Sequence, residues 1–440
     1  MIAIDELKKP FQEINKAKLP YLFLFIQFVY FSGLVKQFGT DEFLVANILF
    51  TGLLCVTHKK ITNNDYKIML AALGVFVLIN IVPSISYGFS PRLVLGYSGR
   101  IFLGILIVLY FKHDFFKVFE NLVFALALIS LPLFLIQLVH AQFFDLFSGF
   151  SHLVLTNSRL HFGRGELTGH RYLLIFLVNS WGEFRNSGFM WEPAAFGAML
   201  SWAMVINGFT HRFTVNARLI ILVLASLTTF SIGTYLYLLI FSVIFLSRNY
   251  TSKSVLSFVL ILAILTPICY RLDFVEKNFE MISWKMEVVQ IRADQISRGH
   301  SPEEVSRVGG FLGNIKEIIF EPFGFGARYS IAEEQGLYIS PNGFMTLARN
   351  WGMFSLLLIF ICFYKFVKKL RKIYEVNVDL AQTVLLMILV VLPIAGNPFY
   401  NQPLLFSILL CGFIVSPKPH PMFLTKKCFF KCRRMLVYEQ

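Results

Sequence analysis

Long apolar stretches alternate with short polar or basic turns along most of the chain. Many of them approach the roughly 17–25 residues that an α-helix needs to cross a bilayer. We predict spans at residues 20–35, 43–57, 67–83, 97–111, 118–140, 191–209, 254–270, 343–364, 378–394 and 403–415, and two more within 218–247. The pattern indicates an all-α polytopic membrane protein with about twelve transmembrane helices, folded as a single integral membrane domain over residues 1–440.

The stretch 218–247 is too long for one span and is interrupted by Ser231-Ile232-Gly233-Thr234. Its length is just enough for two short helices that meet at a polar turn. We therefore expect a helix on each side of this turn.

Two long loops are predicted on the outer face, at residues 141–189 and 271–342. Lysine-rich turns fall on the opposite side, which is the inner side by the positive-inside rule, and both termini are predicted to be cytoplasmic. Within the first loop, residues 172–178 are too short to span and predict a strand or a re-entrant piece. Helical spacing of apolar residues predicts amphipathic helices in the second loop.

The net charge of +14 does not indicate a nucleic-acid-binding protein, because the lysines cluster beside predicted span ends. The chain has no HExxH motif and no His/Cys/Asp cluster at metal-ligand spacing, so we expect no catalytic metal. The hydrophobic content of 56% is too high for a soluble protein to bury.

Arginine, rather than lysine, is enriched in the outer loops. Arg100, Arg185 and Arg349 each fall within a turn or two of the predicted outer surface. The planar guanidinium binds phosphate oxygens in a bidentate way and stays charged, so together they are suited to a diphosphate head group. The alternative is scattered arginines that snorkel or pair with loop carboxylates, and for Arg185 and Arg349 we favour the binding role because of their depth.

Glu192 directly precedes Pro193, at the predicted start of a span. It is either a general base, whose pKa partly apolar surroundings would raise, or a helix-capping carboxylate that interacts favourably with the helix N-terminus. The sequence leaves both interpretations open.

Three stretches resemble the bacterial polysaccharide polymerases and O-antigen ligases of the Wzy/WaaL family. They are Arg185-x-x-Gly188-x-x-x-Glu192-Pro193 at the start of a span, Leu227-Thr228-Thr229-Phe230-Ser231-x-Gly233 between two short spans, and Pro322-Phe323-Gly324-Phe325-Gly326 followed by Asn342 and, after nine residues, Gly352. Their order and positions in the topology match the family. The ligase pattern has a histidine before the asparagine, where this chain has Pro341, and a Gly, Thr or Tyr where it has Ser355, so the polymerase branch is favoured.

The resemblance implies a GT-C-like glycosyltransferase of the bacterial inner membrane with its active site on the periplasmic face. It would transfer a polyprenyl-diphosphate-linked glycan onto the non-reducing end of another lipid-linked repeat unit, without a metal or cofactor. Its partners would be these lipid-linked oligosaccharides, membrane lipids and a chain-length regulator, with no nucleic acid. The implied roles are catalysis for Glu192 and Arg185, diphosphate binding for Arg100, Arg185, Arg328 and Arg349, and substrate positioning for Asn342, Trp191 and Gly188.

Three alternatives are open. The nearest is an O-antigen ligase that moves a finished glycan from the same carrier to lipid A core or a protein. A transporter of lipid-linked oligosaccharides predicts ionisable residues near the bilayer midplane and two matching halves, and neither pattern is present in the sequence. A non-enzymatic scaffold leaves the deep outer arginines beside a carboxylate without an explanation.

Overall fold

The computed structural model describes residues 12–15, 18–35, 38, 40–57, 62–87, 91–155, 171–178, 185–249, 322–324, 343–396 and 403–415. The predicted span at 254–270 and nearly all of the second outer loop, with its predicted amphipathic helices, lie outside the described residues. The described part is mostly helical, in agreement with the predicted all-α class.

The helices in chain order are α2 (Lys18–Ser32), α3 (Asp41–Thr57), α4 (Asn63–Tyr87), α5 (Pro91–Phe111), α6 (Phe115–His140), α7 (Ser148–Val154), α9 (Pro193–Thr210), α10 (Ala217–Leu227), α11 (Ile232–Asn249), α16 (Gly343–Tyr374), α17 (Leu380–Gly396) and α18 (Pro403–Ile414). Each predicted span within the described residues, except the one at 343–364, coincides with a helix, since a long apolar run satisfies its own backbone hydrogen bonds best as a helix. The expected break within residues 218–247 is confirmed, because α10 ends at Leu227 and α11 begins at Ile232.

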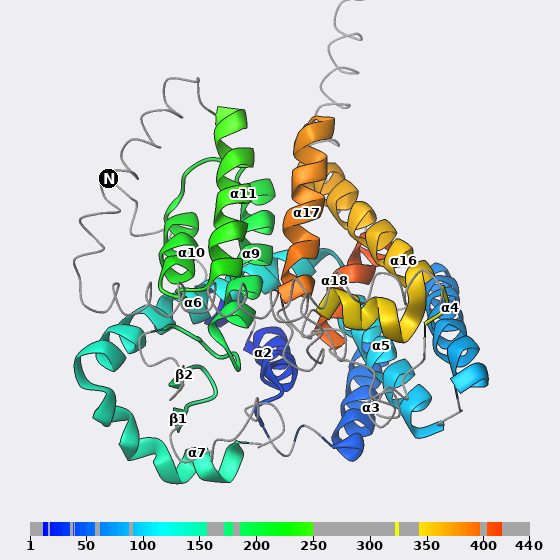
Figure 1. The fold of residues 1–440 in the computed structure, drawn as a ribbon, viewed down its shortest axis with the longest axis horizontal. Helices are drawn as coiled ribbons and strands as arrows, with labels where there is room; N and C mark the ends of the chain where they lie inside the picture. The colour runs from blue at the N-terminus through cyan, green and yellow to red at the C-terminus, as the bar shows by residue number, and fades with distance from the viewer. Residues whose placement is uncertain are drawn as a thin grey trace, which may run out of the picture.

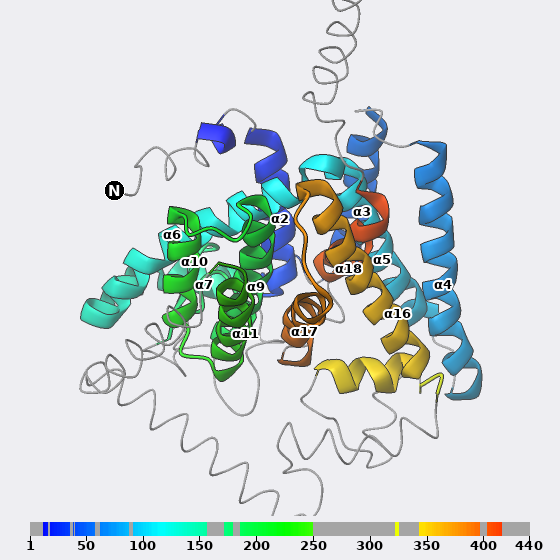
Figure 2. The ribbon, with the colours of Figure 1, turned by 90° about the horizontal axis from the view of Figure 1, so that it is seen from above.

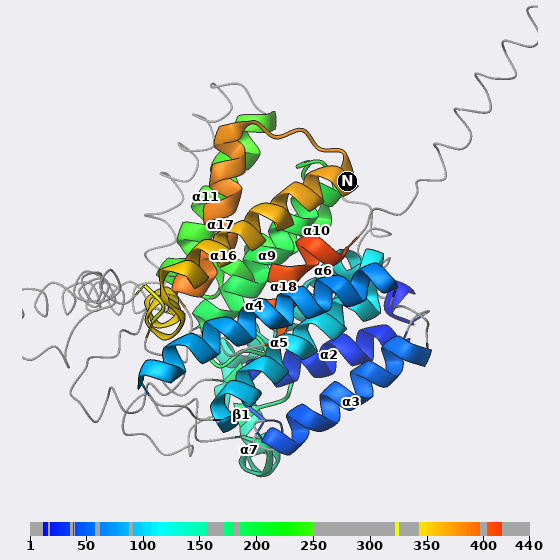
Figure 3. The ribbon, with the colours of Figure 1, turned by 90° about the vertical axis from the view of Figure 1, so that its right-hand side faces the viewer.

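The helices form two groups joined by α16, α17 and α18 (Figure 1). In the first group, α9 packs against α6, α10 and α11. In the second, α5 packs against α3 and α4, and these helices lie side by side in Figure 3. The middle helix α17 contacts α9, α11 and α16, while α18 contacts α5 and α16.

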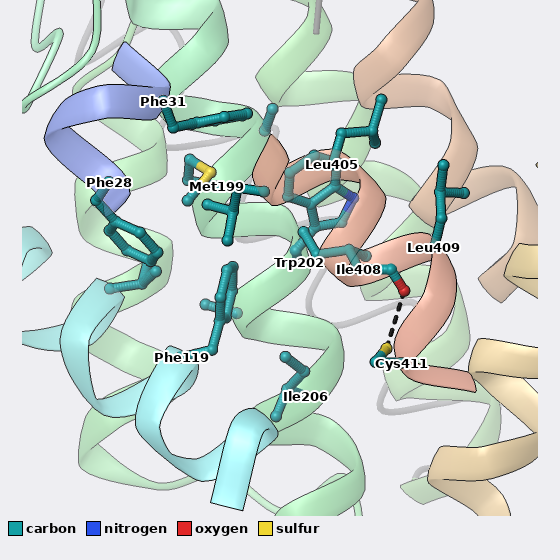
Figure 4. Close-up of a cluster of buried hydrophobic side chains, with 14 of the residues drawn as sticks. Phe28, Phe31, Phe119, Met199, Trp202, Ile206, Leu405, Ile408, Leu409 and Cys411 are labelled. Carbon is teal, nitrogen blue, oxygen red and sulfur yellow. Dashed lines mark hydrogen bonds between the residues drawn. The ribbon is translucent and has the colours of Figure 1, made fainter. Parts of the chain in front are cut away.

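Trp202 of α9 lies at the centre of the apolar core that joins these groups (Figure 4). Phe28 and Phe31 of α2, Phe119 of α6 and Leu405 of α18 belong to the same cluster of buried side chains. The Trp202 indole Nε1 donates a hydrogen bond of 3.1 Å to the Val390 carbonyl of α17, so the polar edge of this buried ring is satisfied.

A two-stranded antiparallel hairpin, β1 (Arg171–Tyr172) and β2 (Leu177–Val178), confirms the strand alternative for residues 172–178. Tyr172 is fully buried, and its hydroxyl donates to the Leu174 carbonyl at 3.2 Å. Burial raises the pKa of Tyr172, so this side chain is a neutral anchor for the hairpin. The first part of the predicted loop 141–189 is helical, because the 3-10 helix Ala141–Phe147 and α7 follow directly after α6.

The single long span predicted at residues 343–364 is wrong. Within α16, Gly352 has φ 76° and ψ 177°, and the helix bends sharply there (Figure 2). A β-carbon at this position would overlap the Pro322 carbonyl oxygen, so only glycine fits both the backbone conformation and the space. Residues 343–351 therefore form a separate helical piece, and the longer straight part begins after the bend.

Two segments in the described part of the chain, Val94–Phe111 and Phe115–Ser151, are long and apolar enough to cross a membrane. Several further apolar helices have 10–17 residues. These segments support membrane association, while the number of spans stays a prediction.

Candidate functional site

The stretch that opens α9 is a largely buried, non-helical segment with a turn at Gly188, which we call the Arg185 segment (residues 185–192). Asn186, Ser187, Phe189 and Met190 are each 0% exposed. Three backbone hydrogen bonds hold the segment, from the Asn186 amide to the Thr228 carbonyl (2.9 Å), from the Leu177 amide to the Gly188 carbonyl (2.6 Å) and from the Met190 amide to the Ser187 carbonyl (3.0 Å). The segment is thereby fixed between the hairpin and the turn that joins α10 to α11.

Gly188 lets the segment turn against α9. Its φ is +50°, and a β-carbon there would lie 2.7 Å from the Phe196 ring. The Gly188 amide donates to the Asn186 side-chain oxygen at 2.9 Å. The glycine is therefore required by the backbone, and its role in substrate positioning stays a prediction. Trp191, also predicted to position substrate, is 3% exposed and packs in the main apolar cluster.

Arg185 points at the polar turn between α10 and α11. Its Nε donates to the Thr229 carbonyl at 3.2 Å, and its charge interacts electrostatically with the hydroxyl of Tyr235. The Tyr235 hydroxyl donates to the Leu227 carbonyl at 3.0 Å, which places the ring beside the same turn. A guanidinium is thus held in a defined direction at the end of three apolar helices, α9, α10 and α11.

Hydrogen bonds between buried polar side chains connect the Arg185 segment to α6 and to the turn between α10 and α11. The Asn186 amide nitrogen donates to Ser130 Oγ of α6 (3.1 Å) and to Thr228 Oγ1 (2.9 Å). Buried polar groups are costly unless they are hydrogen-bonded, so this pairing fixes the Arg185 segment to two helices at once.

Glu192 occupies the N-cap position of α9, with extended backbone angles of φ −152° and ψ 156°. Its carbonyl accepts the hydrogen bond from the Phe196 amide (3.2 Å), but its side chain makes no capping hydrogen bond. The carboxylate therefore lies where the helix dipole favours it, close in sequence to Arg185. The general-base role stays a prediction.

A second cation lies in the other helix group. The Arg100 guanidinium carbon of α5 is 5.7 Å from the centre of the Tyr97 ring, and the same ring is in edge contact with Trp351 at 5.7 Å between centroids. Arg349 belongs to the helical piece before the bend of α16, and its side chain lies outside the described part. Arg328 and Asn342 lie wholly outside it.

Arg100 and Arg185 therefore have different neighbours, on α5 and at the α10–α11 turn respectively. Their convergence with Arg349 and Arg328 on one diphosphate stays a prediction. Within the described ranges, no group of three or more His, Cys, Asp or Glu side chains is placed to hold a metal ion.

No family model, curated protein or solved structure matches this chain. The resemblance carried by the three motifs thus stays a prediction, and the function has to be argued from the site itself.

A buried ion pair between Glu120 of α6 and Arg218 of α10 was missed by the sequence analysis. Glu120 is 1% exposed, and its Oε1 lies 3.4 Å from Arg218 Nη1. Asn207 of α9 donates to the same Glu120 oxygen at 2.7 Å, and Asn121 accepts from Arg218 at 2.8 Å. The sequence did contain an indication of this pair, because Glu120 is an ionisable residue inside the predicted span 118–140, and such residues are usually paired. The network joins α6, α9 and α10 at the end predicted to face the cytoplasm.

Proposed function

We propose that this protein is a bacterial polysaccharide polymerase of the inner membrane. It transfers a polyprenyl-diphosphate-linked glycan onto the non-reducing end of a second lipid-linked repeat unit, at the periplasmic face and without a metal. The observation that carries the proposal is the Arg185 segment, which holds a guanidinium and a carboxylate at the opening of an apolar helix.

A membrane setting is supported by the surface of the helices as well as by their length. On α3, Val45, Leu49, Leu53 and Val56 recur at helical spacing and are 55–68% exposed. Such a stripe is unfavourable in water but matches the acyl chains of a bilayer. A lipid carrier would reach the site from this apolar surrounding, while its diphosphate stays at the outer rim.

The reaction follows from the charges at the site. A hydroxyl of the acceptor sugar attacks the anomeric carbon of the donor, a new glycosidic bond forms, and the bond between that carbon and the diphosphate oxygen breaks. Glu192 accepts the hydroxyl proton. Arg185, directed by its bond to the Thr229 carbonyl, stabilises the negative charge that develops on the departing diphosphate.

The test is the Arg185→Ala variant in membranes supplied with lipid-linked repeat units. Removing one preorganised group that stabilises developing charge typically costs about 100-fold or more in rate, so the ladder of polymer lengths should disappear. Arg185→Lys keeps the charge without the bidentate fork and should retain an intermediate rate. The matched control is Arg92→Ala, since Arg92 is 86% exposed and only pairs with Asp41.

Ladders of normal length in Arg185→Ala membranes, at equal protein level, would contradict the proposed role. Supplying lipid A core in place of a second repeat unit separates polymerase from ligase. Accumulation of unextended repeats on the far side of sealed vesicles would instead indicate a transporter.

A further inference from the structure

The last turns of α16 carry an exposed basic face, formed by Lys365, Lys368 and Lys372. All three side chains are exposed, and their spacing of three and four residues places them on one side of the helix. The opposite side of these turns packs into the bundle, since Phe366 and Leu370 are buried. The end of α16 therefore presents three ammonium groups in one direction, away from the core.

No carboxylate compensates for the basic face in the part of the chain that the structure describes. None of the ion pairs found there includes a residue of 365–372, and the exposed Glu375, the next acidic residue along the chain, takes part in none of them. The crowding is felt by the partly buried Lys369, because burial and then the charges of Lys372 and Lys365 lower the pKa of Lys369. A bound anion would relieve this repulsion.

The same side of α16 continues toward the start of the helix as an apolar stripe, formed by Phe354, Leu357 and Ile361. These residues precede Lys365 at intervals of three and four positions and are 55%, 58% and 43% exposed. At 1.5 Å per residue, the stretch from Phe354 to Lys365 is about 16 Å long. This is the depth of one leaflet, since the hydrocarbon core of a bilayer is about 30 Å thick. The stripe and the basic face together match the acyl chain and the charged head of one lipid molecule.

Two exposed aromatic rings lie beside the ammonium groups. Lys365 Nζ is 5.9 Å from the centre of the Phe413 ring of α18. Lys368 Nζ is 6.0 Å from the centre of the Tyr364 ring. Gly412 allows α18 to come this close, because a β-carbon there would lie 2.5 Å from a backbone nitrogen of α16. Exposed aromatic rings next to cations are typical of the boundary between acyl chains and head groups.

We propose that this side of α16 binds an anionic phospholipid. The phosphate lies among the lysines of the basic face, and one acyl chain lies along the apolar stripe. The positive-inside rule accounts for the sign of the charge at this end of the helix, but not for the alignment of the cations with a stripe as long as one leaflet. Lys368 lies about 24 Å along α16 from the bend at Gly352. The site is therefore distinct from the end of α16 that carries Arg349, and it does not depend on the proposed function.

The test measures equilibrium binding of phosphatidylglycerol to the full-length protein in detergent micelles. The site variant combines Lys365→Gln, Lys368→Gln and Lys372→Gln. Since each cation near the head groups typically contributes about fivefold in affinity, we expect the site variant to bind about 100-fold more weakly. Lys368→Gln alone is a milder variant, with an expected loss of about fivefold. Replacement of all three lysines by arginine keeps the charge and should keep most of the affinity.

The matched control removes three exposed lysines from other helices on the same predicted side, by Lys18→Gln, Lys67→Gln and Lys117→Gln. Its net charge equals that of the site variant, so any non-specific attraction is reduced equally. We expect the control to bind phosphatidylglycerol as the wild type does. Because every substituted side chain is exposed, both variants should unfold at the wild-type temperature.

Two further probes separate a lipid from a free phosphate. Glycerophosphoglycerol, the same head group without acyl chains, should not displace the bound lipid, and phosphatidylcholine, with a zwitterionic head, should bind far more weakly. Wild-type affinity in the site variant would overturn the proposal, as would an equal loss in the control variant. Displacement by the free head group at the same concentration as by the lipid would contradict the role of the apolar stripe and overturn the proposal as well.

Discussion

A close contact between α9 and α11, near the start of α9, predicts the effect of a single methyl group. Gly197 of α9 faces Thr234 of α11, and a β-carbon at position 197 would overlap Thr234 Oγ1 and lie 2.8 Å from both its Cβ and its Cγ2. Side-chain rotation of Thr234 cannot relieve the contact with Cβ. Gly197→Ala must therefore push α11 away from α9, because small residues are what allow such close approach.

Overpacking a tight contact typically costs about 1–3 kcal/mol. Alanine recovers up to about 1 kcal/mol of this through its higher helix propensity. We expect Gly197→Ala to lower the free energy of unfolding by about 1–2 kcal/mol. Activity should fall further than stability, because α11 follows the turn whose Thr229 carbonyl directs Arg185, and a misplaced guanidinium loses alignment with the diphosphate.

The assay is thermal unfolding of the purified protein together with polymer formation in membranes. Thr234→Ala in the Gly197→Ala background removes the overlapping Oγ1 and the Cγ2 but leaves the Cβ contact at 2.8 Å, below the 3.0 Å limit that real β-carbons essentially never cross, so it should restore part of both properties. The control is Gly74→Ala, where a β-carbon meets nothing within 4 Å and stability should stay equal or rise. If Gly197→Ala behaves like the control, the close packing of α9 on α11 is refuted.

Two further predictions concern charges away from the site. Arg218→Met should destabilise the protein by about 3–5 kcal/mol in chemical unfolding, because it leaves the buried Glu120 without its counter-charge, whereas replacing both partners by apolar residues should recover much of the loss. Asp65 precedes the predicted span of α4. Although burial alone raises the pKa of Asp65, hydrogen bonds from Lys112 (2.8 Å) and Thr62 hold it below its usual value. Its stabilising contribution is therefore complete above about pH 4 and is lost as the pH falls through the lowered pKa, and an acid unfolding series should show this dependence for the wild type and not for Asp65→Asn.

Local sequence predicted most of the long helices in the described part of the chain, but not α7, which lies within the predicted loop 141–189, nor the bend in α16. A long run without charge can satisfy its backbone in an apolar setting only as a helix, so the apolar stretches predicted α2 to α6 and α9 to a few residues. The break between α10 and α11 was also predictable, because Ser231–Thr234 places polar groups and a glycine in a run too long for one helix. The run at 172–178 was too short to span and left a strand or a re-entrant piece open, and the structure decided for a hairpin of two short strands.

Only the tertiary structure determined which side chains from different helices lie next to one another. At the bend, Gly352 packs against the Pro322 carbonyl, which is 30 residues away in sequence and leaves no room for a side chain, and no local pattern contains that contact. The Glu120–Arg218 pair and the separate neighbours of Arg100 and Arg185 likewise arise between distant segments. Hydrophobic periodicity is a short-range property that fixes which residues are helical, whereas the partner of a buried polar group is set by which helices pack together.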